Sequence, residues 1–202
     1  MSALLGPLLP VVVIDDADTA RPLAEALRDG GIRHIEVTLR TPAALDALRA
    51  MTEVDGVTVG AGTILTAEQA DAATAAGAAF LVSPGWDPSL GAHMRRRGAT
   101  WIPGVATPGE AMAARAAGFS RLKLFPVEML GGAAFVDALA AVLPDVTFAP
   151  SGGIRAEQAR DYLSRPSVET VGGSWMAPRD LVRARDFAGV TAASRAAVEA
   201  LS

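Results

Sequence analysis

Eight short apolar runs, rich in β-branched residues, alternate along the chain with segments of helical pattern. Turn residues separate each run from the helical segment that follows it, as expected for strands. The expected strands cover residues 10–14, 34–39, 57–63, 80–85, 100–105, 121–126, 147–153 and 170–174. Three glycines close a helix just before a strand, at a spacing of about 20 residues: Gly77, Gly98 and Gly118. Repeated strand–helix units of this kind build a parallel sheet.

The helices between the strands carry recognisable start signals. Thr41-Pro42 has the pattern of an N-cap followed by a first-turn proline, and Asp87-Pro88 starts another helix in the same way. Capping boxes are expected at two further starts, Thr66 with Gln69 and Thr107 with Glu110. The remaining helices are expected over residues 19–29, 132–143 and 156–163, with one long helical segment from 178 onward.

The number of strand–helix units decides between two α/β architectures. Eight units in 202 residues lie at the lower size limit of the (β/α)8 barrel. An open doubly wound sheet usually has fewer strands and a glycine-rich phosphate loop at the start of its first helix, and this chain has no such motif there. The sequence therefore predicts a single (β/α)8 TIM barrel, with one domain over residues 1–202.

Lys123 is the only lysine among the 18 lysine and arginine residues of the chain, and it lies inside an apolar run. An arginine serves wherever a surface needs only positive charge. Arginine does not lose its proton near neutral pH, whereas a desolvated lysine can do so and attack a carbonyl. Lys123 is therefore a candidate for Schiff-base formation, and the alternative is an ordinary structural lysine.

Alternation along the strands places a second charged group beside this lysine. Leu122 and Leu124 should face the surrounding helices, so Lys123 and Phe125 should point into the interior. The same pattern in the second strand directs Glu36 inward. An amine and a carboxylate in the middle of two strands are costly to bury unless they are paired or used. The pair is either a catalytic pair or a structural salt bridge.

Polar groups and glycines gather where strands end. Arg40 ends the second strand, at the C-terminal mouth where barrel sites are built, and its guanidinium suits a carboxylate or phosphate. The alternative is an exposed arginine at a helix entry. Ser151-Gly152-Gly153 and Gly172-Gly173-Ser174 follow the seventh and eighth strands, where backbone N–H groups can approach a phosphate.

Composition argues against several classes of partner and cofactor. The net charge is -4, and the only run of basic residues is 95–97, so a nucleic-acid partner is not expected. The chain has no cysteine, which rules out disulfides and thiolate metal sites. His34 and His93 have no partner at ligand spacing, so we expect no metal. His34 is expected to be structural and His93 to lie on a helix surface.

The N-terminal residues 1–6 contain no basic residue ahead of their apolar part, so we expect no signal peptide. No apolar run reaches the roughly 18 residues of a membrane span. These features predict a cytoplasmic protein without membrane contact.

Seven blocks of the chain, taken in order, resemble one known family. They are Glu36-Val37-Thr38-Leu39-Arg40-Thr41, Gly60-Ala61-Gly62-Thr63, Ser83-Pro84-Gly85, Pro103-Gly104-Val105, Lys123-Leu124-Phe125-Pro126-Val127-Glu128, Pro150-Ser151-Gly152-Gly153-Ile154 and Gly172-Gly173-Ser174-Trp175. The first and fifth blocks are the specific ones. Over nearly its whole length the chain is similar to the 2-keto-3-deoxy-6-phosphogluconate (KDPG) aldolase family, which includes 4-hydroxy-2-oxoglutarate (KHG) aldolase.

The resemblance implies a class I aldolase, a homotrimeric (β/α)8 barrel that forms pyruvate through a lysine Schiff base and uses no metal or other cofactor. It implies Lys123 as the Schiff-base lysine and Glu36 as the general acid and base. The substrate-binding residues it implies are Arg40 and Thr63 at the pyruvyl part, Pro84 beside them, and Ser151, Gly152, Gly153, Gly173 and Ser174 around the distal hydroxyl and phosphate. Phe125, on the face of Lys123, is expected to line the same site.

Two other functions remain open from the residues alone. A phosphosugar isomerase or epimerase would use Glu36 as its base and Lys123 only as an electrostatic anchor. A non-catalytic sugar-phosphate-binding barrel would use Lys123 to hold an anion. Release of pyruvate distinguishes the aldolase from both alternatives.

Overall fold

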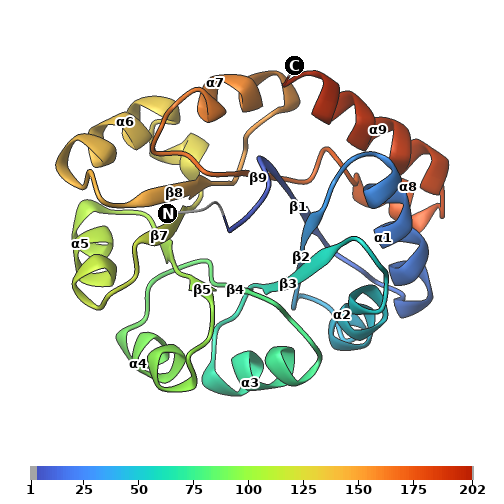
Figure 1. Ribbon diagram of the computed structural model, residues 1–202, viewed down its shortest axis with the longest axis horizontal. Helices are drawn as coiled ribbons and strands as arrows, with labels where there is room; N and C mark the ends of the chain where they lie inside the picture. The colour runs from blue at the N-terminus through green and yellow to red at the C-terminus, as the bar shows by residue number, and fades with distance from the viewer. Residues whose placement is uncertain (1–3, 202) are drawn as a thin grey trace.

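Parallel strands lie at the centre of the computed structural model, and helices surround them (Figure 1), for the described residues 4–201. The strands are β1 (Leu8–Val12), β2 (His34–Thr38), β3 (Thr58–Gly62), β4 (Leu81–Val82), β5 (Trp101–Ile102), β6 (Gly104–Val105), β7 (Arg121–Leu124), β8 (Thr147–Pro150) and β9 (Val171–Gly173). The α-helices are α1 (Ala20–Asp29), α2 (Ala44–Thr52), α3 (Ala67–Ala75), α4 (Pro88–Arg97), α5 (Pro108–Ala116), α6 (Ala133–Val142), α7 (Ala159–Leu163), α8 (Arg179–Arg183) and α9 (Phe187–Glu199). The 3-10 helices are η1 (Ala17–Thr19), η2 (Val127–Leu130) and η3 (Ala156–Gln158).

The strands form two parallel sheets. One has six strands in the order β5-β4-β3-β2-β1-β9, and the other has three in the order β6-β7-β8. Isolated bridges between Ser151 and Gly172, and between Phe148 and Val168, connect the end of the small sheet to the segment around β9. The predicted α/β class with a parallel sheet is confirmed. The predicted fifth strand is divided into β5 and β6 at Pro103, a residue that has no N–H for the ladder.

Both predicted capping boxes begin helices, but only one is complete. Thr107 accepts the Glu110 N–H at 3.2 Å, and the Glu110 carboxylate accepts the Thr107 N–H at 3.0 Å. Thr66 accepts the Gln69 N–H at 3.2 Å. The Gln69 side chain accepts instead from the Leu65 N–H, one residue before the cap. The N-cap prediction is confirmed at both helices, whereas the reciprocal bond forms only in α5.

The two starts predicted from a cap followed by proline have different outcomes. Asp87 accepts the Leu90 N–H at 2.6 Å and caps α4, as predicted. The prediction for Thr41 is wrong, because α2 begins three residues later and has no side-chain cap. The Thr41 hydroxyl donates instead to the carbonyl of Ile14, just after β1. A tertiary hydrogen bond between the loops after β1 and β2 replaces the expected cap.

The long C-terminal helical segment is two helices, not one. Arg185 lies between α8 and α9 with a φ of 56°, in the left-handed region that ends a helix. By contrast, the predicted helices over 19–29 and 156–163 are present. The 3-10 helix η1 precedes α1, and η3 forms the first turn of the second helix. The predicted helix at 132–143 is confirmed as α6.

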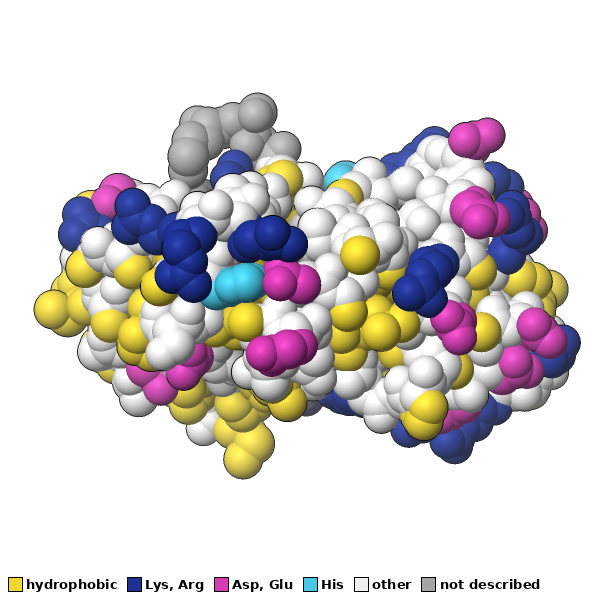
Figure 2. Space-filling model, turned by 90° about the horizontal axis from the view of Figure 1, so that it is seen from below, with side chains coloured by type: hydrophobic (Ala, Val, Ile, Leu, Met, Phe, Trp, Pro, Cys, Tyr) yellow, Lys and Arg dark blue, Asp and Glu magenta, His cyan; other side chains and the backbone are white. Residues whose placement is uncertain are grey.

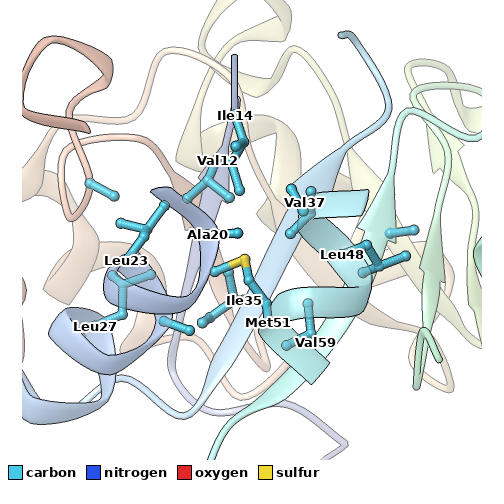
Figure 3. Packing of buried hydrophobic residues seen from close by; sticks show 14 of the residues in the cluster. Val12, Ile14, Ala20, Leu23, Leu27, Ile35, Val37, Leu48, Met51 and Val59 are labelled. Atoms are coloured by element: carbon cyan, nitrogen blue, oxygen red, sulfur yellow. The ribbon is translucent and has the colours of Figure 1, made fainter. Parts of the chain in front are cut away.

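The main hydrophobic core lies between the helices and the outer face of the strands. Ile35 and Val37 of β2 and Leu122 and Leu124 of β7 are fully buried, which confirms the predicted helix-facing side of both strands. Figure 3 shows side chains of β1, β2 and β3 packed with those of α1 and α2. Each such side chain contributes about 1.5–3 kcal/mol on burial. A smaller buried cluster is formed by Leu5, Leu9, Phe80, Val82 and Ile102.

Charged side chains of both signs lie next to one another on the face drawn in Figure 2. Ion pairs of this kind include Arg97 with Asp71 at 3.0 Å and Arg115 with Asp145 at 2.8 Å. Within residues 4–201, no helix has both the length and the apolar character needed to cross a bilayer. The expectation about a signal peptide in residues 1–6 lies partly outside the described residues.

Candidate active site

Lys123 lies on β7 with its side chain in the interior, and only 6% of the residue is exposed. Its partners on the neighbouring strands are the small residues Gly104 and Ala149, so the lysine is not crowded from either side. Lys123 lines an interior pocket. The pocket is bounded by Leu9, Glu36, Val82, Ile102, Lys123, Ala149, Ser151 and Gly172.

Glu36 reaches the same pocket from β2 and is 1% exposed. The Lys123 Nζ lies 3.1 Å from its Oε1 and 3.3 Å from its Oε2. Burying both charges is costly, and their attraction does little more than offset that cost, so the pair adds little net stability. Both residues line the pocket, and their head groups lie within hydrogen-bond distance, so a group that reacts with the amine is also within reach of the carboxylate. This placement favours the catalytic interpretation over the structural salt bridge.

Two glycines of β3 make room for interior side chains. A Cβ at Gly62 would lie 2.1 Å from the Glu36 Oε1, closer than any real contact. A Cβ at Gly60 would lie 2.3 Å from the Phe80 ring. The Gly60-Ala61-Gly62 motif therefore has a packing function: Gly62 gives the Glu36 carboxylate its position, and Gly60 admits the ring of Phe80.

Arg40 and Thr63, both expected at the pyruvyl end, are brought together. The Arg40 Nε donates to the Thr63 Oγ1 at 3.1 Å, across the mouth ends of β2 and β3. Thr63 has a φ of 60°, a left-handed conformation that costs on the order of 1–3 kcal/mol in a non-glycine residue. Backbone strain of this kind clusters at ligand sites. Arg40 is exposed to solvent, as a residue at the mouth should be.

Phe125 directly follows β7, the strand of Lys123, and Pro84 lies just after β4. The centre of the Phe125 ring lies 5.6 Å from the Lys123 Nζ, within the range of a cation–π contact. Pro84 follows β4, and its carbonyl carbon would lie 2.3 Å from a Cβ at Gly104. Ser83 holds this turn, because its hydroxyl donates to the Gly85 carbonyl at 2.8 Å and accepts the Gly104 N–H at 3.3 Å.

The two glycine-rich turns predicted to bind phosphate lie side by side. Ser151 and Gly172 form a bridge, and a Cβ at Gly172 would lie 2.8 Å from the Ser151 Oγ. Gly152 and Gly153 have φ values of 94° and 89°, which only glycine adopts without strain. Gly173 serves a different contact, because a Cβ there would overlap the ring of Trp175.

Ser174 is exposed beside this ring, whereas Ser151 is 6% exposed and lines the pocket. The Trp175 Nε1 is buried and has no hydrogen-bond partner among the described residues. Ser151 and Gly172 thus bring the two turns together at the pocket, and the remaining turn residues follow them in the chain.

The two histidines lie outside the pocket. The His34 Nδ1 accepts the Gly6 N–H at 3.0 Å, and burial lowers the pKa of His34, although Glu169 acts in the opposite direction. This confirms a structural role. The His93 Nε2 lies 2.9 Å from the Asp71 Oδ1, and its side chain is 17% exposed, so it is less exposed than predicted. Within residues 4–201, no three His, Asp or Glu side chains lie close enough together to hold a metal ion.

The apolar wall of the pocket was missed by sequence reasoning. Leu9, Val82, Ile102 and Ala149 each point inward from a different strand. Period-two alternation would have found Val82 and Ile102 if it had been applied to every strand, not only to those with charged residues.

Comparison with known proteins identifies the family. The model of the family described as "Aldolase: KDPG and KHG aldolase" matches residues 3–193. The chain is 47% identical over 174 residues to the 2-dehydro-3-deoxy-phosphogluconate aldolase of Zymomonas mobilis, covering 86% of this chain and 84% of that protein. It is 42% identical over 195 residues to the KHG/KDPG aldolase of Escherichia coli K12, covering 96% and 92%.

Solved structures agree with these relationships. The KDPG aldolase of Zymomonas mobilis with 3-phosphoglycerate has a TM-score of 0.91 at 44% identity, covering 96% of this chain and 91% of that one. The enzyme of Legionella pneumophila, with pyruvate captured as a covalent carbinolamine intermediate, has a TM-score of 0.92 at 38% identity, covering 95% and 94%. The chain described here belongs to the KDPG and KHG aldolase family.

Proposed function

We propose that this protein is a class I aldolase that cleaves KDPG to pyruvate and glyceraldehyde 3-phosphate. The observation that carries the proposal is the buried contact of 3.1 Å between the Lys123 amine and the Glu36 carboxylate, both on one pocket. The names of the relatives support the substrate. The carbinolamine in the Legionella pneumophila structure supports the chemistry, because an amine and a ketone form that species before they lose water.

The reaction begins at Lys123. Its unprotonated amine attacks the C2 carbonyl of the 2-oxo acid, and the carbonyl oxygen takes up a proton to give the carbinolamine. Glu36 is within hydrogen-bond reach of the amine and can accept and return the protons that this step moves. Loss of water then gives an iminium, which withdraws electrons from C3.

Cleavage depends on Glu36. The carboxylate removes the proton of the C4 hydroxyl, directly or through a water molecule, and the C4 oxygen becomes the aldehyde of glyceraldehyde 3-phosphate. The C3–C4 bond pair moves into the iminium and leaves an enamine of pyruvate on Lys123. Protonation of C3 and addition of water release pyruvate and the free amine.

The remaining site residues hold the substrate. In this proposal Arg40 and Thr63 bind the carboxylate of the pyruvyl part, and Pro84 and Phe125 line the space beside it. Fixed geometry of this kind can lower a barrier by about 7–11 kcal/mol at most. Residues that surround the distal hydroxyl and phosphate are Ser151, Gly152, Gly153, Gly173 and Ser174. Catalysis needs no metal or other cofactor.

The proposal also covers how the two sheets close and how the chains assemble. The two sheets are arcs of one eight-stranded (β/α)8 barrel, in which β5 and β6 are the two halves of the fifth strand. The bridges of β8 to the segment around β9 support this arrangement. The barrel is a single domain over residues 1–202 that assembles as a homotrimer and acts in the cytoplasm.

A second activity has support from one relative. The Escherichia coli protein is named KHG/KDPG aldolase. 4-Hydroxy-2-oxoglutarate carries the same 2-oxo acid part and a C4 hydroxyl, so the same steps would give pyruvate and glyoxylate. We propose KHG as a further substrate.

A coupled assay of pyruvate release from KDPG tests the proposal. Wild-type protein should release pyruvate, and Lys123→Arg should abolish turnover with an unchanged circular dichroism spectrum, because arginine keeps the charge but forms no Schiff base. Activity like that of the wild type in Lys123→Arg would refute the mechanism. A wild-type protein that releases no pyruvate would favour the isomerase or the binding barrel.

A further inference from the structure

Glu128 lies outside the pocket, on η2, five residues after Lys123. Its carboxylate joins two side chains of the segment that follows β8. The Tyr162 hydroxyl donates to the Glu128 Oε1, and the Gln158 Nε2 donates to its Oε2 at 3.1 Å. The Gln158 Oε1 in turn accepts the Arg155 N–H at 2.9 Å. Glu128 thus connects the chain after β7 to η3 and α7.

The same residue supports the glycine-rich turn after β8. The Val127 N–H donates to the Ser151 carbonyl at 2.9 Å, and the Glu128 N–H donates to the Gly152 carbonyl at 3.2 Å. A Cβ at Gly153 would lie 2.9 Å from the Glu128 Cβ, so the turn packs directly on this side chain. Residues of η2, which follows β7, therefore hold the Ser151 and Gly152 carbonyls and pack against one face of the turn.

A carboxylate is a poor neighbour for a phosphate site on electrostatic grounds, since like charges repel. Any benefit from Glu128 must then come from geometry and not from charge. Tyr162 is 1% exposed, and burial together with Glu128 raises the pKa of Tyr162, so its hydroxyl remains a donor at neutral pH. A buried donor of this kind holds its acceptor in one place.

We propose that Glu128 is a positioning residue that ties the turn at Ser151, Gly152 and Gly153 to the strand of Lys123, and so sets the separation between the Schiff base and the phosphate end of the substrate. This inference rests on the proposed aldolase function. It predicts that a defect at Glu128 weakens recognition of the phosphate while pyruvate still reaches Lys123 normally.

Three variants and one control separate position from charge. Glu128→Ala removes both side-chain hydrogen bonds and the Cγ beside Gly153, but keeps the Cβ and the backbone bond to Gly152. Gln158→Glu places two carboxylates against each other. The double variant Glu128→Gln/Gln158→Glu exchanges the two groups, so that an amide N–H again faces a carboxylate oxygen with the roles reversed. The control Glu157→Gln removes one charge from η3 at an exposed side chain that pairs with Arg155.

The readout is the ratio of kcat/KM for KDPG to kcat/KM for 2-keto-3-deoxygluconate, which lacks the phosphate. Borohydride trapping of pyruvate gives the half-saturating pyruvate concentration at Lys123. We expect Glu128→Ala and Gln158→Glu to lower the ratio on the order of tenfold, as expected for a lost hydrogen bond to a charged group. Pyruvate trapping should stay at the wild-type concentration. The exchange variant should recover most of the ratio, and Glu157→Gln should keep it.

Two results would overturn the inference. One is an unchanged ratio in Glu128→Ala and Gln158→Glu. The other is a lower ratio that is always accompanied by a matching rise in the half-saturating pyruvate concentration at Lys123. If Glu128→Ala does not fold, Gln158→Glu and the exchange variant carry the same comparison. Absence of a pyruvate adduct in wild-type protein would overturn the proposed function and the inference with it, whereas an adduct with an unchanged ratio overturns the inference alone.

Discussion

Gly62→Ala tests whether the position of the Glu36 carboxylate sets the activity. The new Cβ would lie 2.1 Å from the Glu36 Oε1 and 2.6 Å from its Cγ. Ordinary contact begins at 3.4 Å, so the carboxylate must retreat by 3.4 − 2.1 = 1.3 Å. Gly62 ends β3 and its φ is not in the left-handed region, so alanine adds no backbone strain of its own.

This retreat removes the 3.1 and 3.3 Å contacts of Glu36 with Lys123. A misplacement of about 1 Å costs on the order of 100-fold in rate. At 1.36 kcal/mol for each factor of ten, that is about 2.7 kcal/mol of activation free energy. Overpacking of the interior should also lower the free energy of unfolding by about 1–3 kcal/mol.

The assay measures kcat by coupled pyruvate release, and urea unfolding measures stability. Gly60→Ala is the matched control, because its Cβ projects from the same face of the same strand but lies 2.3 Å from the Phe80 ring. It should lose similar stability and keep far more of its kcat. The reasoning is refuted if Gly62→Ala retains kcat like the wild type, or if Gly60→Ala loses as much kcat.

Two further predictions concern proton transfer and pH. Glu36→Gln keeps the shape of the side chain but cannot move protons, so kcat should fall by about 10²–10⁴-fold in the same assay, and an unchanged kcat would contradict the proposed role. His34 has a lowered pKa in the native state because it is buried, so the unfolded chain binds its proton more readily and stability falls as pH drops below about 6.5. His34→Gln should flatten the decline in unfolding free energy between about pH 7 and 5, where one such group contributes up to roughly 1.4 kcal/mol per pH unit. A decline as steep as that of the wild type in urea titrations would show that another group causes it.

Alternation within single strands was enough to predict the interior faces. Leu122 and Leu124 are in the helix-side core, and Lys123 and Glu36 are inside, as the period of two requires. The distance between the amine and the carboxylate could not be predicted in this way. β2 and β7 lie in different sheets, so their separation depends on how the strands curve around the interior.

Errors occurred where tertiary contacts override local signals. Thr41-Pro42 has every local feature of a helix start, yet the Thr41 hydroxyl donates to the Ile14 carbonyl in the loop after β1. The break between α8 and α9 falls at Arg185, in a conformation that usually signals itself by a glycine or asparagine. The different packing functions of Gly60 and Gly62 could not be predicted either. They depend on contacts with Phe80, just before β4, and with Glu36 of β2, and these contacts form only in the folded chain.

Borohydride reduction in the presence of pyruvate, followed by peptide mapping by mass spectrometry, tests the central claim most directly. Lys123 is the only lysine, so only its amine and the N-terminal amine can be trapped. The aldolase mechanism predicts a reduced pyruvyl adduct on the peptide that contains Lys123. Folded protein at saturating pyruvate with no adduct on that peptide would contradict the mechanism.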